Sequence, residues 1–174
     1  MKHLTRIVVL GLLSCTCFAC DFLNVIDNTL QIAGEKVEHV ALSEEEYQVL
    51  NQIFTLSNPI MKKHVEKYEK LSEEVILIGS QQDLLYYCPD SITPPEIDFK
   101  NHCLIFSIVS TPTIQSTIRT VDLYLQDNGT ATFYTNIKAA SMDNLVSLAF
   151  PYGVFDVPEE KIKQLNIIAR RSWY

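Results

Sequence analysis

The five cysteines have the most distinctive side-chain chemistry in this sequence, and they fall into two groups. Cys15, Cys17 and Cys20 lie close together near the N-terminus, whereas Cys88 and Cys103 lie in the body of the chain. An exported protein rarely leaves an odd thiol, because its cysteines are lipidated or paired. Lipidation at Cys20 would leave two unmodified cysteines in the mature protein and lipidation at Cys15 would leave four. Simple cleavage before Cys20 would leave three and is disfavoured.

The N-terminus has the order of an export signal. Basic residues within Met1–Arg6 precede an apolar run, Ile7–Leu13, that is shorter than the ~20 residues a membrane-spanning helix needs. A small residue followed by Cys occurs at Ser14-Cys15 and Ala19-Cys20, the pattern of a bacterial lipobox, in which the Cys is diacylated and becomes the mature N-terminus. The first site has the better upstream residues but leaves a very short signal. We predict a lipoprotein signal peptide over residues 1–19 with lipidation at Cys20, and Cys15 is the alternative.

Cys88 and Cys103 form a candidate disulfide. They flank a Pro-rich segment of a protein predicted to fold outside the cytoplasm, and closing that loop would stabilise the fold by ~3 kcal/mol in the chain-entropy model. The alternative is two buried, reduced thiols that act as small apolar side chains, because the sequence does not give the Cα separation that a disulfide requires. We expect the two residues to be paired or at least neighbouring.

No other group of residues has the pattern of a catalytic or metal site. The chain lacks the Gly-x-Ser-x-Gly elbow, the His-Glu-x-x-His motif and the Gly-rich loops that bind phosphates or dinucleotides. His39, His64 and His102 show no metal-ligand spacing. His102 and Cys103 are adjacent, and neighbouring residues of a strand point to opposite faces, so they are not expected to act as base and nucleophile. The sequence therefore predicts a protein that is not an enzyme and has no metal or other cofactor.

Composition and charge narrow the class of partner. The chain has 174 residues, 47% of them hydrophobic, and so can form one domain with a substantial core. Its formal net charge is −7, and removal of a basic signal peptide makes the mature chain more acidic. Such a protein lacks the attraction to phosphate on which nucleic-acid binding depends, so nucleic acid is excluded as a partner.

Helices are predicted in the N-terminal part of the mature chain. Ser43-Glu44-Glu45-Glu46 is a capping box with acids at the positive end of the helix dipole, and apolar residues recur at helical spacing up to Ser57. Pro59 suits the first turn of a second helix, which we expect to end near Lys70. Residues 20–41 show no sustained period and are predicted to be a tether, with at most a short strand or helical turn.

From Glu74 onward the apolar pattern is that of strands. We expect strands over Val75–Gly79, Leu84–Cys88, Cys103–Ser110, Thr117–Leu125, Thr130–Ile137, Leu145–Phe150 and Leu165–Arg170, and a short helical turn at Pro158–Lys161. Asn128-Gly129 predicts a type I′ hairpin turn, because this pair accepts positive φ at both central positions. The predicted fold class is α+β: N-terminal helices packed on a mainly antiparallel, partly closed β-sheet, in a single domain over 42–174 whose mainly β part is 75–170.

Three segments of the β region have an order of features found in a known family. They are Ile78–Leu85, Pro95–Phe99 with Leu104–Phe106, and Phe150–Pro158. The chain resembles the C-terminal domain of the protease-complex component PrcB, and small Bacteroidetes lipoproteins with a similar core, over somewhat more than half its length. The resemblance implies a module that binds and stabilises an exported protease. The chain differs from the family in its glycine-poor middle strands and in the helical region Ser43–Lys70.

For several residues in or near these segments, a structural role is the alternative to a role in binding. Ile97 and Phe99 would point inward at a strand entry, and Asp98 would cap a turn. Asp90-Ser91-Ile92 resembles the O-glycosylation site of exported Bacteroidetes proteins, with Ser91 as the acceptor. Tyr and Trp are enriched at interfaces, although burial in the core is the alternative for each. The candidate contact residues are Tyr86, Tyr87, Pro94, Pro95 and Tyr152, with Trp173 and Tyr174 at the C-terminus.

These observations predict a lipid-anchored protein of the bacterial outer membrane or cell surface, facing the periplasm or the exterior. Its expected function is to bind another protein, as partner, stabiliser or inhibitor of an exported protease. An exposed strand edge, or the loops around Pro94-Pro95 and Pro112 entering a cleft, would make the contact. The alternative is a surface lipoprotein that binds a small ligand or glycan in a pocket lined by Tyr86, Tyr87 and Tyr152.

Overall fold

The computed structural model describes residues 31–57, 73–111, 116–139 and 147–173. The chain divides into two units, Met1–Ile32 and Ala33–Tyr174, and the elements named below belong to the second. The predicted signal peptide, the lipidation candidates Cys15 and Cys20, the predicted helix from Pro59 to Lys70, and Pro112 lie outside the described residues. None of the helices in the described ranges is both long and apolar enough to cross a membrane.

The strands of the described residues form two four-stranded sheets. The first has the order β1-β4-β5-β8, antiparallel except for the parallel pair β5–β8, and its strands are β1 (Glu35–Val37), β4 (Ser116–Leu125), β5 (Thr130–Ala139) and β8 (Gln164–Trp173). The second is antiparallel and is built around β3 (Cys103–Thr111). In this sheet β2 (Glu73–Ile78) pairs with one edge of β3, while β6 (Ser147–Ala149) and β7 (Tyr152–Phe155) share the other.

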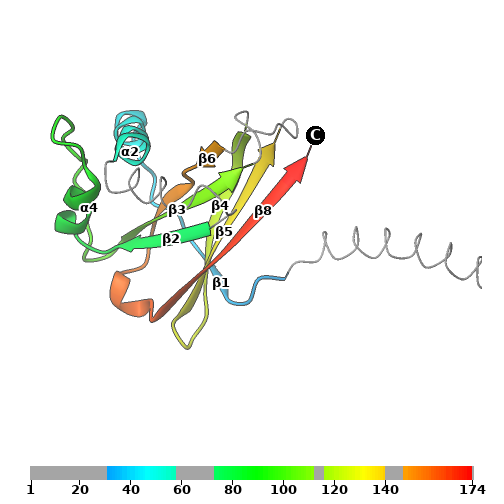
Figure 1. Ribbon diagram of the computed structural model, residues 1–174. Coiled ribbons are helices and arrows are strands. Elements are labelled where there is room, and N and C mark those ends of the chain that lie inside the picture. Colours follow the sequence, from blue (N-terminus) through cyan, green and yellow to red (C-terminus); the bar gives the residue numbers. More distant parts are fainter. Residues whose placement is uncertain (1–30, 58–72, 112–115, 140–146, 174) are drawn as a thin grey trace, which may run out of the picture. The chain divides into compact units, whose positions relative to one another are not determined.

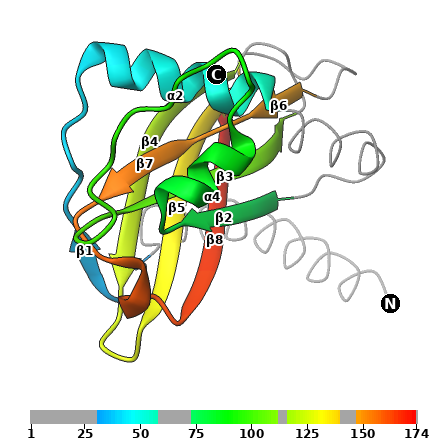
Figure 2. The ribbon, with the colours of Figure 1, turned by 90° about the vertical axis from the view of Figure 1, so that its left-hand side faces the viewer.

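Two helices lie on the outer face of the second sheet, with the first sheet behind it (Figure 1, Figure 2). Helix α2 (Glu44–Leu56) begins with the predicted capping box, because Ser43 Oγ accepts from the Glu46 amide and the Glu46 carboxylate accepts from the Ser43 amide. Helix α4 (Gln81–Tyr87) connects β2 to β3. The order is therefore helices, β2–β3 sheet, β1–β8 sheet.

The α+β class is confirmed, but three details of the prediction were wrong. The strands form two open sheets instead of one partly closed sheet. The predicted strand Leu84–Cys88 is helix α4, because Ser80 caps it by accepting from the Asp83 amide and Leu84 is its one buried residue. A cap followed by a helical burial pattern overrides the strand propensity of Leu-Leu-Tyr-Tyr. As α4 lies between strands, the helices are not confined to the N-terminal part of the domain.

Most other predicted elements are confirmed with small shifts at their ends. The exceptions lie around Phe150: β6 is the described part of the predicted strand Leu145–Phe150, and the strand β7 was missed. The predicted turn before the last strand is the 3-10 helix η1 (Glu159–Lys161). Residues Ala33–Ala41 were assigned to a tether but belong to the folded unit, because β1 pairs with β4.

Strand β3 supplies side chains to two cores. All nine of its residues are buried, and alternate residues of a strand point to opposite faces. Leu104, Phe106 and Ile108 face the helices in a cluster here called the helix-side core, with Leu50, Ile53, Phe54 and Leu84. Cys103, Ile105 and Val109 face the first sheet in the inter-sheet core, with Leu123, Ala131, Phe133, Ile137 and Phe155.

Polar contacts connect the two sheets along both sides. On one side Arg171 of β8 reaches the second sheet, with Nη1 2.7 Å from Glu73 Oε1 and Nε donating to the Ser110 carbonyl at 2.9 Å. On the other side the chain leaving β1 crosses to β7: the Asp156 amide donates to the Glu38 carbonyl at 3.0 Å, and the Val40 amide to the Val154 carbonyl at 2.9 Å.

The β4–β5 hairpin is present, but its turn is not of the predicted type. Gly129 has φ +85°, whereas no described residue other than glycine has positive φ, so Asn128 does not adopt the conformation of a type I′ turn. The Gly129 amide donates to the Gln126 carbonyl at 2.9 Å and the Gln126 amide to the Thr130 carbonyl at 3.0 Å. This is a longer loop with glycine in the left-handed position. Asn128 Oδ1 instead accepts from the Thr130 amide at 2.8 Å.

We expect Gly129→Ala to lower the free energy of unfolding by about 1–3 kcal/mol, because a Cβ is strained at this φ. That Cβ would also lie 2.9 Å from Lys163 Cγ and 3.0 Å from the Lys161 carbonyl oxygen. The control Asn128→Ala removes only an exposed hydrogen bond and should cost less than ~1 kcal/mol. Urea unfolding followed by circular dichroism measures both, and equal losses for the two variants would contradict the assigned role of Gly129.

Candidate functional site

The two cysteines of the folded unit are not paired. Cys88 and Cys103 are both free thiols, so the predicted disulfide is wrong. The physical reason is the alternation of β3, which directs Cys103 into the inter-sheet core, while Cys88 packs against the helix-side core on the other face of the sheet. Cys88 Sγ donates to the Ile92 carbonyl at 3.0 Å. The alternative interpretation, two reduced thiols used as small apolar side chains, describes them better.

Burial favours the protonated form of both thiols. It raises the pKa of Cys103 to about 12, with a smaller contribution from the negative charge of Glu159. Burial also raises the pKa of Cys88, with Asp90 adding to the effect. Because the thiolate is the nucleophile, a raised pKa leaves neither cysteine equipped for covalent catalysis.

Helix α4 presents Tyr86, a candidate contact residue with a strongly exposed aromatic side chain. Tyr86 is 67% exposed and its neighbour Leu85 is 52% exposed. The Tyr86 ring lies 5.0 Å from that of half-buried Tyr87, edge to face, and the Tyr87 ring lies 5.3 Å from that of Phe106 in the helix-side core. The exposed Tyr86 ring thus packs against the Tyr87 ring, which itself packs against the core.

Tyr152 belongs to the core instead of a contact surface. It is only 9% exposed, and its hydroxyl donates to the Tyr47 carbonyl at 2.8 Å. Burial, and then the interaction with Tyr47, raises the pKa of its hydroxyl. Its ring contacts those of Tyr47 and Phe54. Three cavities of about 590, 430 and 450 Å³ among the described residues are lined by other residues than the three tyrosines predicted to line a ligand pocket.

The segment 88–102 after α4 is held in place by polar and apolar contacts. Gln81 Nε2 donates to the Pro95 carbonyl at 3.0 Å, and Pro94 and Pro95 are half-buried. Ile97 and Phe99 pack against the helix-side core. Asp98 caps a turn as predicted: its carboxylate accepts from Asn101 Nδ2 and from the Lys100 amide, which lowers its pKa. Ser91, the candidate glycosylation site, is exposed.

A cavity at one end of the two sheets was not expected from the sequence. It has a volume of about 590 Å³ and is called the end cavity here. It is lined by Glu35–Glu38 at β1, by Leu125–Asp127 and Gly129 at the β4–β5 hairpin, and by Asp156, Val157, Glu160, Lys161 and Lys163 after β7. A volume of this size is ordinary for a ligand site.

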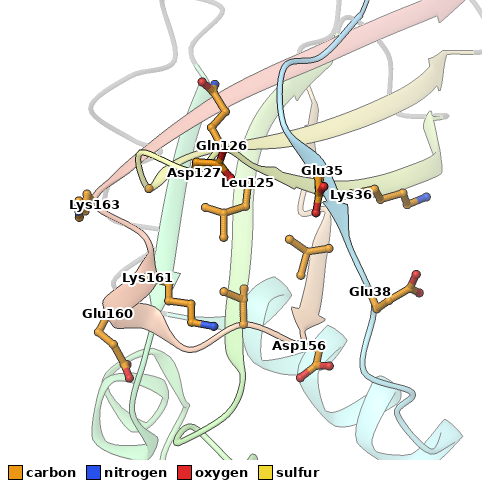
Figure 3. A pocket seen from close by; sticks show the side chains of 13 residues that line it. Glu35, Lys36, Glu38, Leu125, Gln126, Asp127, Asp156, Glu160, Lys161 and Lys163 are labelled. Carbon is orange, nitrogen blue, oxygen red and sulfur yellow. The ribbon is translucent and has the colours of Figure 1, made fainter.

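The end cavity combines apolar and charged groups (Figure 3). Glu35 and Lys161 point toward the space around Leu125 from different sides, whereas Lys36, Glu38 and Lys163 point away from it. Val37 and Val157 complete the apolar lining. Lys36 Nζ contacts the buried Asp122 at 2.6 Å, and this hydrogen bond raises the pKa of Lys36. No ion pair involves Glu35 or Lys161 among the described residues.

The described residues contain no group of three or more His, Cys, Asp or Glu side chains placed to hold a metal ion. His102 lies 3.5 Å from Asp156, but the side chain of the adjacent Cys103 is buried. The end cavity offers charge and apolar surface without a base held near a nucleophile.

Comparison of the chain with protein-family models, with curated proteins and with solved structures finds no match.

The thiol assignment is testable by alkylation with iodoacetamide in the absence of reductant. After unfolding, we expect the peptides containing Cys88 and Cys103 to carry the label quantitatively. In the folded protein Cys103 should react much more slowly, with little acceleration between about pH 7 and 9, because its thiol stays protonated below its raised pKa. Mass spectrometry of the tryptic peptides gives both results, and unlabelled cysteines in the unfolded protein would mean a disulfide.

Proposed function

We propose that the protein is an exported, lipid-anchored bacterial protein whose folded domain binds another protein without catalysing a reaction. The observation that carries this proposal is the surface of α4, where Tyr86 and Leu85 are both more than half exposed. Tyrosine is enriched among the residues that dominate binding energy at interfaces, because it supplies a large contact area with few rotatable bonds.

The surroundings of Tyr86 support this proposal because they are fixed before a partner binds. Tyr87 connects Tyr86 to the core through Phe106. Next to them, the segment 88–102 is fastened through Pro95, Ile97 and Phe99. A preorganised surface loses less conformational entropy on association than a loose one. Two of the PrcB-like motifs, Ile78–Leu85 and Pro95–Phe99, fall in this region and favour an exported protease as the partner.

Binding of a glycan or small ligand by the three tyrosines has less support. That function required Tyr86, Tyr87 and Tyr152 to converge on one cavity, and Tyr152 is buried with its hydroxyl bonded to the Tyr47 carbonyl. Exposure of Ser91 next to Asp90 favours O-glycosylation of the chain itself at this position.

Export and lipidation are tested at the mature N-terminus. We expect mass spectrometry of the protein from a native membrane fraction to show an N-terminal peptide that starts at Cys20 and carries a diacylglyceryl group, and Cys20→Ala should prevent its formation. Cys15 as the modified residue would identify the alternative site. Recovery of an unmodified peptide that runs through residues 10–20 would refute export as a lipoprotein.

The contact surface is tested by site-specific photo-cross-linking in cells. We expect a benzophenone side chain at position 86 to give a cross-linked product of defined mass, which mass spectrometry identifies as an exported protein. The control is the same group at Ile118 of β4, which is also exposed, by 40%, and should give no such product. Tyr86→Ala should weaken binding of the identified partner by about 2 kcal/mol. No product at position 86, or identical products at both positions, would contradict the proposed surface.

A further inference from the structure

The backbone of β1 has an unpaired side among the described residues. In the first sheet β1 is the end strand, and β4 pairs with only one of its edges. Two residues after Lys36, the Glu38 carbonyl accepts from the amide of Asp156, which directly follows β7 of the second sheet. Backbone groups of alternate residues in an extended chain point to the same side. The N–H and C=O of Lys36 are therefore directed to the side on which Glu38 meets Asp156.

The place beside Lys36 is where β7 would continue if it were longer. β7 ends at Phe155, the Val157 amide turns back to the Phe155 carbonyl at 2.8 Å, and Pro158 follows. The chain after β7 then turns away from β1 and forms η1. The end cavity occupies this place, since four consecutive residues, Glu35–Glu38, line it together with Asp156 and Val157. Consecutive lining residues indicate that the edge of the strand borders the cavity, because one face would contribute only alternate residues.

The shape of the cavity suits an extended ligand. A second cavity, of about 430 Å³, is lined by Ala33–Glu35 and Leu125–Asn128. It shares Glu35, Leu125, Gln126 and Asp127 with the end cavity. The two cavities therefore adjoin along these four residues. A peptide of several residues can extend through both cavities, whereas a compact molecule would not fill them.

The charges favour a basic ligand. Five carboxylates line the end cavity, against three lysines. Glu38, Lys36 and Lys163 point away from it (Figure 3), and Lys36 is engaged with Asp122. Glu35 points toward the apolar lining, and Asp156 lies at the opposite end of the cavity from Gln126 and Asp127 (Figure 3). The whole chain adds to this field with its formal net charge of −7. Complementary charge increases both the rate of encounter and the selectivity of binding.

We propose that the end cavity binds an extended, basic segment of a partner protein as an added strand beside β1. The segment pairs with the backbone of Lys36. One of its inward side chains is apolar and packs on Val37, Leu125 and Val157, and a basic side chain two residues away meets the carboxylate of Glu35. Strand addition obtains affinity from main-chain hydrogen bonds and selectivity from alternate side chains. This inference rests on the proposed protein-binding function but uses a surface separate from Tyr86.

The experiment measures fluorescence anisotropy of a labelled peptide with the full-length protein in detergent. The probe is Ser-Lys-Thr-Val-Thr-Lys-Ser, in which alternate positions carry Lys, Val and Lys, and its counterpart has Glu in place of both Lys. We expect the basic probe to bind about 10-fold more tightly than the acidic one, and this preference to shrink as salt is added.

Substitutions test the site by the sign of their effects. Glu35→Gln should weaken binding of the basic probe about 3- to 5-fold, and Lys161→Gln should strengthen it by a similar factor. The matched control Glu45→Gln removes an exposed carboxylate from the first turn of α2 and should leave binding unchanged. Circular dichroism of each variant confirms that it is folded.

Hydrogen exchange tests the backbone contact separately. Exchange of the Lys36 amide should slow when the basic probe saturates the protein. Preference for the acidic probe, weaker binding after Lys161→Gln, unchanged exchange at Lys36, or no binding of the basic probe below about 1 mM would each overturn the inference. Since this assay uses no partner protein, its failure is independent of the cross-linking result at position 86.

Discussion

The structure depends on the burial of β3 on both faces. A strand of an antiparallel sheet often exposes one face to water, but all nine residues of β3 are buried. Its two sets of alternate side chains therefore need two covers, and the chain provides the β1–β8 sheet on one side and the helices α2 and α4 on the other. The three layers follow from this one requirement.

The packing of helices α2 and α4 on the β2–β3 sheet explains which tyrosines have a structural role. Six rings form a series of contacts from Tyr86 to Tyr47 through Tyr87, Phe106, Phe54 and Tyr152. Aromatic pairs at such separations stabilise more than their buried area alone. The inner members fasten both helices to the β2–β3 sheet, whereas Tyr86 and Tyr47 at the two ends remain about half exposed or more. The contact surface on α4 is thus an extension of the core.

The elements that could be predicted from the sequence are those that local side-chain chemistry determines. The capping box at Ser43 and the alternating runs before and after Gly129 specified α2 and the β4–β5 hairpin. The helix over Leu84 was missed because its cap at Ser80 competes with residues of high strand propensity. Cys103 and Cys88 were expected together because they flank the Pro-rich segment, but closeness in sequence does not decide which face of the β2–β3 sheet each side chain packs on. The end cavity combines three segments far apart in sequence, so no local pattern could indicate it.

Which strand edges are covered, and which are not, connects the fold to the proposed binding of a partner strand. Exposed edges invite pairing with other chains, and proteins usually cover or charge them. Here Arg171 bonds β8 to Glu73 and to the Ser110 carbonyl, and residues 38–40 are paired with β7. Among the described residues, the part of β1 without a partner on this side is short and lies among carboxylates. A second copy of this acidic chain would bring like charges to that edge, so the same charges that disfavour self-association favour a basic strand from another protein.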